Sequence, residues 1–107
     1  PDIGKWGGVD GCFAIAKKAT AAGKSYCPHW LSGGIGLLHS AHVLSAADGK
    51  GLLEIDSNPN PLRTMITEHL QDLEDSHLQL GTKPGIGIEN PLEKLTEYIL
   101  DHQSFSS

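Results

Sequence analysis

The feature that most constrains the fold of this chain is a set of three polar residues, each of which closes a short apolar or strand-like run. They are Asp2, His29 and Glu54, and their positions along the chain are nearly evenly spaced. The two stretches between them have the character of helices. A strand with its crossover helix takes about 30 residues, so this spacing predicts a repeat of βα units. The carboxyl ends of parallel strands lie at one face of such a repeat, where active sites are found. We therefore expect the three side chains to gather at one face.

Two helices and two short strands are predicted around these residues. A helix is expected over residues 9–22, where apolar side chains recur at helical spacing, and a second over residues 34–47, which is apolar almost all round. Strands are expected over residues 24–27 and 52–55. The second strand is followed by Asn-Pro-Asn-Pro, which can continue neither a helix nor a ladder of paired strands.

The last third of the chain changes character after Arg63. An edge strand with alternating leucines is predicted over residues 77–83, and a glycine-rich loop over residues 84–89. A short amphipathic helix with proline at its start is expected over residues 91–102.

Size and charge exclude several classes of protein. The chain has 107 residues, whereas a barrel of eight βα units needs about 200 or more, so we expect it to be part of a larger domain. The net charge is −5 and no basic stripe with interleaved aromatic residues occurs, which argues against nucleic-acid binding. The apolar runs are shorter than the roughly 18 residues of a membrane span, so no membrane partner is expected.

The two cysteines, Cys12 and Cys27, do not form a Cys-x-x-Cys motif. One lies in a predicted helix and the other in a predicted strand. We expect both to be buried free thiols, which is typical of a cytoplasmic protein.

A histidine between two carboxylates is suited to proton transfer. Each residue also has a simpler explanation, because Asp2 precedes a glycine-rich turn and His29 follows a proline at a strand end. Glu54 is harder to explain in this way, since it interrupts an apolar strand and an unpaired buried carboxylate is costly. Together, and at βα spacing, the three residues favour a catalytic site.

Three other features are better explained by packing or solvation. His39 and His42 lie three apart, a spacing that could bind a metal, but no further ligand lies near them in the sequence. The glycines after Ser32 match phosphate-loop fingerprints only in part. Lys5 is expected to be solvated rather than to bind an anionic substrate.

Four ordered motifs together carry a family resemblance. They are Pro-Asp-Ile-Gly-Lys-Trp-Gly-Gly at 1–8, Cys-Pro-His-Trp at 27–30, Leu-Leu-Glu-Ile-Asp-Ser-Asn-Pro-Asn-Pro-Leu-Arg at 52–63 and Pro-Gly-Ile-Gly-Ile-Glu at 84–89. In these motifs the chain resembles the C-terminal part of the mandelate racemase/muconate lactonizing enzyme family, within the enolase superfamily.

The resemblance implies an α/β fold, namely the C-terminal portion of a modified (β/α) TIM-type barrel. Residues 1–63 would run from the end of the sixth strand through the eighth, and residues 64–107 would form the C-terminal closing segment. His29 would be the general acid/base and Asp2 its hydrogen-bonded partner. Glu54 would lie against the substrate carboxylate, protonated or strongly hydrogen-bonded.

The resemblance further implies an enzyme that abstracts the proton next to a carboxylate with the help of Mg²⁺. Aspartate at position 2, where the muconate-cycloisomerase type carries lysine, favours a sugar-acid dehydratase or a hydroxy-acid racemase. The metal ligands are expected upstream of this chain, so the 107 residues alone are expected to be inactive. The partners expected are a small carboxylate substrate and either further copies of the protein or its N-terminal part. The alternative is a non-catalytic domain that acts in assembly or binding.

Overall fold

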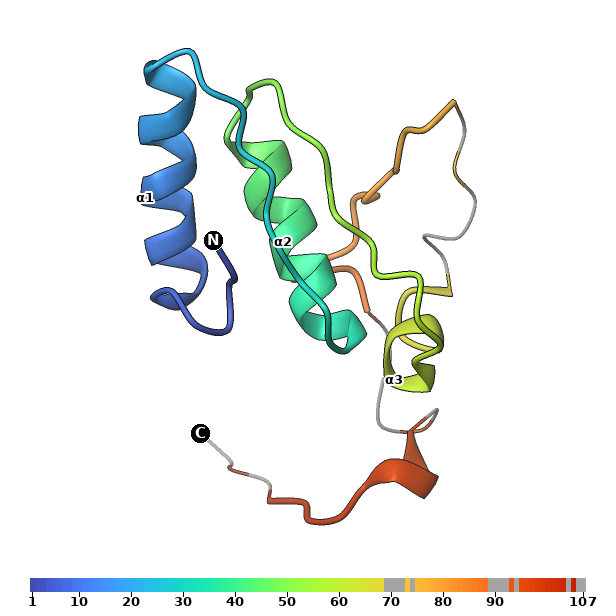
Figure 1. Cartoon of the computed structure of the whole chain (residues 1–107). Helices are drawn as coiled ribbons and strands as arrows, with labels where there is room; N and C mark the ends of the chain where they lie inside the picture. The colour runs from blue at the N-terminus through green and yellow to red at the C-terminus, as the bar shows by residue number, and fades with distance from the viewer. Residues whose placement is uncertain (69–72, 74, 89–92, 94, 104, 106–107) are drawn as a thin grey trace.

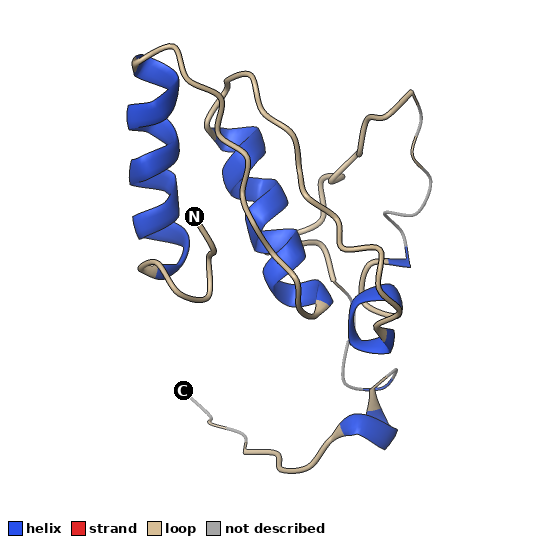
Figure 2. Ribbon diagram, viewed as in Figure 1, coloured by secondary structure: helices blue, strands red, loops and turns tan. Residues whose placement is uncertain are grey.

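The computed structural model describes residues 1–68, 73, 75–88, 93, 95–103 and 105. Its helices are α1 (Gly8–Ala21), α2 (Gly34–Ala46), the short α3 (Pro61–Thr64) and the 3-10 helix η2 (Thr96–Tyr98). Helices α1 and α2 lie side by side, and α3 follows beyond one end of α2 (Figures 1 and 2). In this described part of the chain, each helix is too short or too polar to cross a membrane.

Glycines with positive φ lie on either side of helix α1. Gly7 precedes it with a positive φ of 71°, and Gly23 follows it at 69°, a left-handed conformation that glycine adopts without steric cost. Asp10 in the first turn and Lys18 in the last complement the helix dipole. The predicted helix over residues 9–22 is thus confirmed to within one residue.

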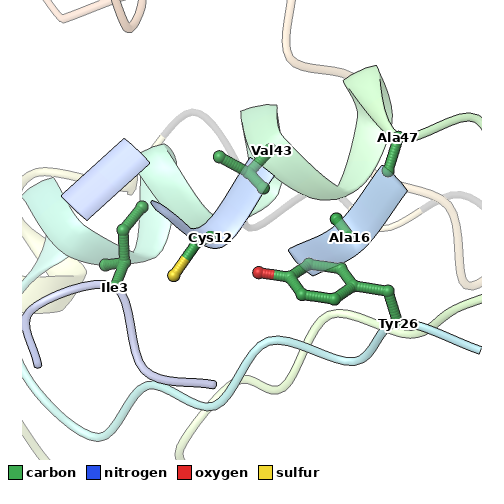
Figure 3. Packing of buried hydrophobic residues seen from close by; sticks show 6 residues of the cluster. All are labelled: Ile3, Cys12, Ala16, Tyr26, Val43 and Ala47. Carbon is green, nitrogen blue, oxygen red and sulfur yellow. The ribbon is translucent and has the colours of Figure 1, made fainter. Parts of the chain in front are cut away.

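Helix α2 is buried on several sides, in agreement with its nearly uniform apolar sequence. Its buried residues include Leu37 and Val43. One face contributes to a cluster with α1, formed by Ile3, Cys12, Ala16, Tyr26, Val43 and Ala47 (Figure 3). Leu38 on the same helix packs with Ile66 in a second cluster, which the last third of the chain covers with Leu78, Ile86, Ile88 and Leu95. Helix α2 is therefore the centre of the fold.

The predicted strands over residues 24–27 and 52–55 are not formed as regular strands. Both segments run in the same direction alongside α2 (Figure 1), and His29, just beyond the first of them, forms an isolated parallel bridge with Asp2. The backbone amide of Tyr26 donates to the carbonyl of Lys50 at 3.3 Å. A regular strand requires a continuous ladder of such bonds, and these segments share too few of them. The structure therefore keeps the alternation of helices with parallel extended segments, although these segments are not regular strands.

Two further predictions in the last third of the chain are also wrong or incomplete. The edge strand predicted over residues 77–83 is not formed beyond a bridge position at His77, and Leu78 packs against the second cluster. Of the helix predicted over residues 91–102, positions 91, 92 and 94 lie outside the described residues, and η2 ends at Tyr98. The loop after Pro84 is present as expected over its described part, residues 84–88.

Candidate functional site

The three polar residues are carried by extended segments that lie next to one another. His29 pairs with Asp2 through the parallel bridge, in which the His29 amide donates to the Pro1 carbonyl at 3.1 Å. On its other side, the segment of His29 contacts the segment of Glu54, since the Leu52 amide donates to the Cys27 sulfur at 3.4 Å. The expected order of the three segments, with His29 in the middle, is therefore the order in the structure.

The side chain of His29 contacts Glu54. Its ring Nδ1 lies 2.8 Å from Oε1 and 3.0 Å from Oε2 of the carboxylate. Both side chains are close to half exposed, at 46% and 45%, so a solute can reach them. Pro28, fully buried just before His29, fixes the backbone from which the ring projects. The His29 imidazole is thus accessible and is oriented by Glu54, as an imidazole that transfers protons must be.

The Asp2 carboxylate has a different set of partners. It accepts a hydrogen bond from the Gly4 amide at 2.9 Å, and it forms an ion pair with Lys5 Nζ at 3.1 Å. Partial burial acts to raise the pKa of the Asp2 carboxyl. The hydrogen bonds from Lys5 and Gly4, together with the positive charges of Lys5 and His29, outweigh that effect and lower the pKa below its ordinary value. Asp2 is thus held as a carboxylate.

An open cavity of about 420 Å³ adjoins this cluster. Its lining combines the polar residues with the turn that follows His29, and consists of Asp2, Gly4, Lys5, His29, Trp30, Leu31 and Ser32. The Trp30 indole N–H donates to the Gly33 carbonyl at 2.7 Å and so closes this turn. The cavity brings a carboxylate, an ammonium group and an imidazole to one surface.

Lys5 and Trp30 are the members of this site that were not predicted from the sequence. Lys5 was expected to be a solvated lysine and its side chain is 77% exposed, but its ammonium group also forms an ion pair with Asp2. The separation of three residues between Asp2 and Lys5 was the available signal, because a tight turn brings such residues together. Trp30 follows His29 directly, and nothing in the local sequence indicates where its ring lies.

The described residues do not fit a metal site. They include no group of three or more His, Cys, Asp or Glu side chains that could hold a metal ion. His39 Nδ1 donates within its own helix to the Ile35 carbonyl at 2.8 Å. The Nε2 atom of His42 is buried. The residues Asp2 and Glu54 are engaged by Lys5 and His29.

Comparisons with known proteins identify relatives of this chain. A family described as enolase C-terminal domain-like matches residues 1–94. An arabinonate dehydratase from Saccharolobus solfataricus is 29% identical over 86 residues, which are 80% of this chain and 23% of that protein. A crystal structure of a mandelate racemase/muconate lactonizing enzyme from Bordetella bronchiseptica RB50 superposes with a TM-score of 0.83 at 44% identity, over 92% of this chain and 28% of that one.

These comparisons bear on the fold and on the extent of the chain. The chain spans about a quarter of the length of the relatives it matches. The family match begins at Pro1 and so includes all three of Asp2, His29 and Glu54. The resemblance inferred from the four sequence motifs is confirmed: this chain belongs to the enolase C-terminal domain-like family.

Proposed function

We propose that this chain is part of an enzyme that removes the proton next to the carboxylate of a sugar acid or hydroxy acid, with His29 as the group that accepts it. The observation that carries the proposal is the contact of the His29 ring with Glu54 at 2.8 Å, beside an open cavity whose lining includes Asp2 and His29. Similarity to an arabinonate dehydratase supports sugar acids as the substrate class.

The reaction begins with transfer of the proton on the carbon next to the carboxylate to the His29 ring. In a dehydratase, the neighbouring hydroxyl group then leaves with a proton as water. In a racemase, a proton returns to the same carbon from the opposite face. Both outcomes start from the same step at His29, and the dehydratase relative favours the first.

The proposal includes a Mg²⁺ ion whose ligands lie outside these 107 residues. Enzymes of the enolase superfamily combine a lysine or histidine base with Mg²⁺. The described residues contain no site that fits a metal, and the chain covers 28% of the related crystal structure. We therefore assign the metal ligands to other parts of the longer protein and expect the 107-residue chain alone to be inactive.

The test is the His29→Asn substitution in the longer polypeptide that contains these residues. With arabinonate or another sugar acid in deuterated water, we expect the substitution to abolish exchange of the substrate proton, measured by NMR. His39→Asn is the matched control, since His39 hydrogen-bonds within its own helix, and it should leave exchange intact. Retained exchange in the His29→Asn protein contradicts the proposed role.

The second candidate function is assembly through apolar side chains left at the surface. Leu52 is 78% exposed and Ile55 46% exposed, on the segment that carries Glu54. Large apolar side chains that gather at a surface mark contacts with other protein segments. We propose that this edge packs against another copy of the chain. Size-exclusion chromatography tests this, because a well-behaved monomer of the 107-residue chain would argue against it.

A further inference from the structure

Helix α1 lies at one edge of the molecule and exposes part of its surface (Figure 1). On that surface Val9 is 44% exposed, and Phe13, one turn further along, is 36% exposed. Both side chains border a groove of about 300 Å³ between α1 and α2. The opposite wall of the groove belongs to α2 and consists of His39, His42, Val43 and Ala46. The described part of the chain therefore leaves apolar surface of α1 uncovered.

Two opposite charges flank this apolar surface. Asp10 and Lys17 are both exposed, and within the described part of the chain neither forms an ion pair. Their separation of seven residues is about two turns, so they project from the same side of α1, roughly 10 Å apart. Phe13 and Ala14, which are exposed as well, lie halfway between them. This side of α1 thus has a negative end, an apolar centre and a positive end.

This arrangement is complementary to itself. A contact with two-fold symmetry requires that residue i of one copy meets residue j of the other, while j meets i. When two copies of α1 pack antiparallel, centred between residues 13 and 14, Asp10 of each copy faces Lys17 of the other. Phe13 of each copy leans toward the groove, so the two rings meet across the axis, where an aromatic pair is favourable. On the other side of the axis lies the small Ala14 of each copy, which lets the helices approach closely.

We propose that α1 is a contact surface for a second copy of this protein, in which the two α1 helices pack antiparallel about a two-fold axis. A second copy is favoured over an unrelated protein because the two charges lie symmetrically about the apolar centre, as a two-fold contact requires. The contact is separate from the edge that carries Leu52 and Ile55. It also goes beyond the proposed function, since it does not depend on proton transfer at His29.

The contact is expected to be weak when it acts alone. Helix α1 has 14 residues and is about 21 Å long, so one pair of such helices buries less than the roughly 1,200 Å² of a stable interface. We therefore expect a dissociation constant in the micromolar range or above. It should increase with salt concentration, because the ion pairs at the rim of the contact are screened.

The first test is disulfide trapping in the longer polypeptide that contains these residues, in a Cys27→Ser background. In the antiparallel register, the Cα atoms of the two Ala14 residues lie about 5–7 Å apart, within reach of a disulfide bond. We expect Ala14→Cys to form a covalent dimer with oxidised glutathione, detected on a non-reducing gel. Ala21→Cys is the matched control, since it is exposed on the same helix but far from the axis, and it should not form this dimer.

The second test changes the charges and measures the dissociation constant by sedimentation velocity. Asp10→Lys alone, or Lys17→Asp alone, places like charges opposite each other and should raise the dissociation constant about tenfold or more. The two substitutions together restore opposite charges in the same register and should return it to the value of the natural protein. Lys24→Asp, which is exposed and lies outside α1, is the control for net charge and should leave the value unchanged.

Three outcomes overturn the proposal. The first is a yield of covalent dimer from Ala14→Cys that does not exceed the yield from Ala21→Cys. The second is a double charge variant that associates no better than either single variant. The third is an Ala14→Cys thiol that resists iodoacetamide, because the remainder of the longer protein then covers α1. None of these measurements requires catalysis, so they are independent of the proton-exchange result for His29→Asn.

Discussion

The indole ring of Trp30 packs directly on the backbone of Gly36 and leaves no room for a side chain there. A Cβ at position 36 would overlap the six-membered part of the ring. The same indole donates its N–H to the Gly33 carbonyl at 2.7 Å. Trp30 thus joins the turn after His29 to the first turn of α2, and this contact fixes the segment from which His29 projects.

Replacement of Gly36 by alanine is expected to destabilise the protein. Glycine to alanine inside a helix normally stabilises by about 0.5–1 kcal/mol, whereas overpacking costs about 1–3 kcal/mol. Since the new methyl group meets Trp30, overpacking should dominate. Urea unfolding measures the difference, and Trp30→Leu in the same background should recover part of it. An increase in the free energy of unfolding for Gly36→Ala alone would contradict the contact.

Tyr26 should make stability fall at high pH. Its side chain is only 4% exposed, and burial, with the neighbouring Cys12 thiol, raises the pKa of its phenol to about 12. The unfolded chain has a tyrosine pKa of about 10, so the folded state holds this proton more tightly. The resulting stabilisation is complete below about pH 10 and is lost as pH rises toward 12. Unfolding experiments across this range should show the loss in the natural protein, and a smaller loss in Tyr26→Phe. Equal losses in both proteins would assign the effect to other groups.

The helices could be predicted because their signals are local. Gly7 and Gly23 mark the ends of α1, and the spacing of Cys12 and Ala16 identifies its buried face. The segments around His29 and Glu54 gave equally clear strand signals, but a strand exists only through its ladder to neighbours. The sequence alone does not say how many neighbouring strands are present. It therefore could not show that these segments lack the hydrogen-bond ladder that a regular strand requires.

The site could be predicted as a group but not in its detailed contacts. The spacing of Asp2, His29 and Glu54 placed them on adjacent parallel segments, and the structure brings them together. The carboxylate that contacts the imidazole depends on how the loop at Gly4 and Lys5 folds back on Asp2. That is a matter of side-chain reach within a turn, which residue spacing along the chain does not determine.

The two thiols should differ strongly in reactivity. Both were expected to be buried, but only Cys12 is, at 0% exposure, while Cys27 is exposed. Alkylation depends on access to the sulfur, so the folded protein should incorporate one equivalent of iodoacetamide rapidly and a second only on unfolding. Intact mass spectrometry counts the adducts. Cys27→Ser should remove the fast reaction and Cys12→Ser should not; the reverse pattern would refute the burial of Cys12.

Acid should reduce the contribution of the loop after Glu54 to the stability of the protein, because the Asp56 carboxylate binds Arg63 and Asn58 in its ionised form. The carboxylate pairs with Arg63 at 3.4 Å, both side chains being about nine-tenths buried, and accepts the amide and side chain of Asn58 at 3.0 and 2.7 Å. The Asn58 amide is the main cause that lowers the pKa of Asp56; partial burial opposes it, and the Asn58 side chain and Arg63 lower the pKa further.

A carboxyl with a depressed pKa stabilises the fold above its unfolded pKa of about 3.9 and loses that contribution as pH falls through its folded pKa. We therefore expect Asp56→Asn to lower the melting temperature at neutral pH, and the gap to the natural protein to close as pH falls below about 4. Asp101→Asn, at an exposed position, is the control and should leave the melting temperature close to that of the natural protein throughout. A gap for Asp56→Asn that stays constant with pH would mean that the charge of Asp56 does not stabilise the loop.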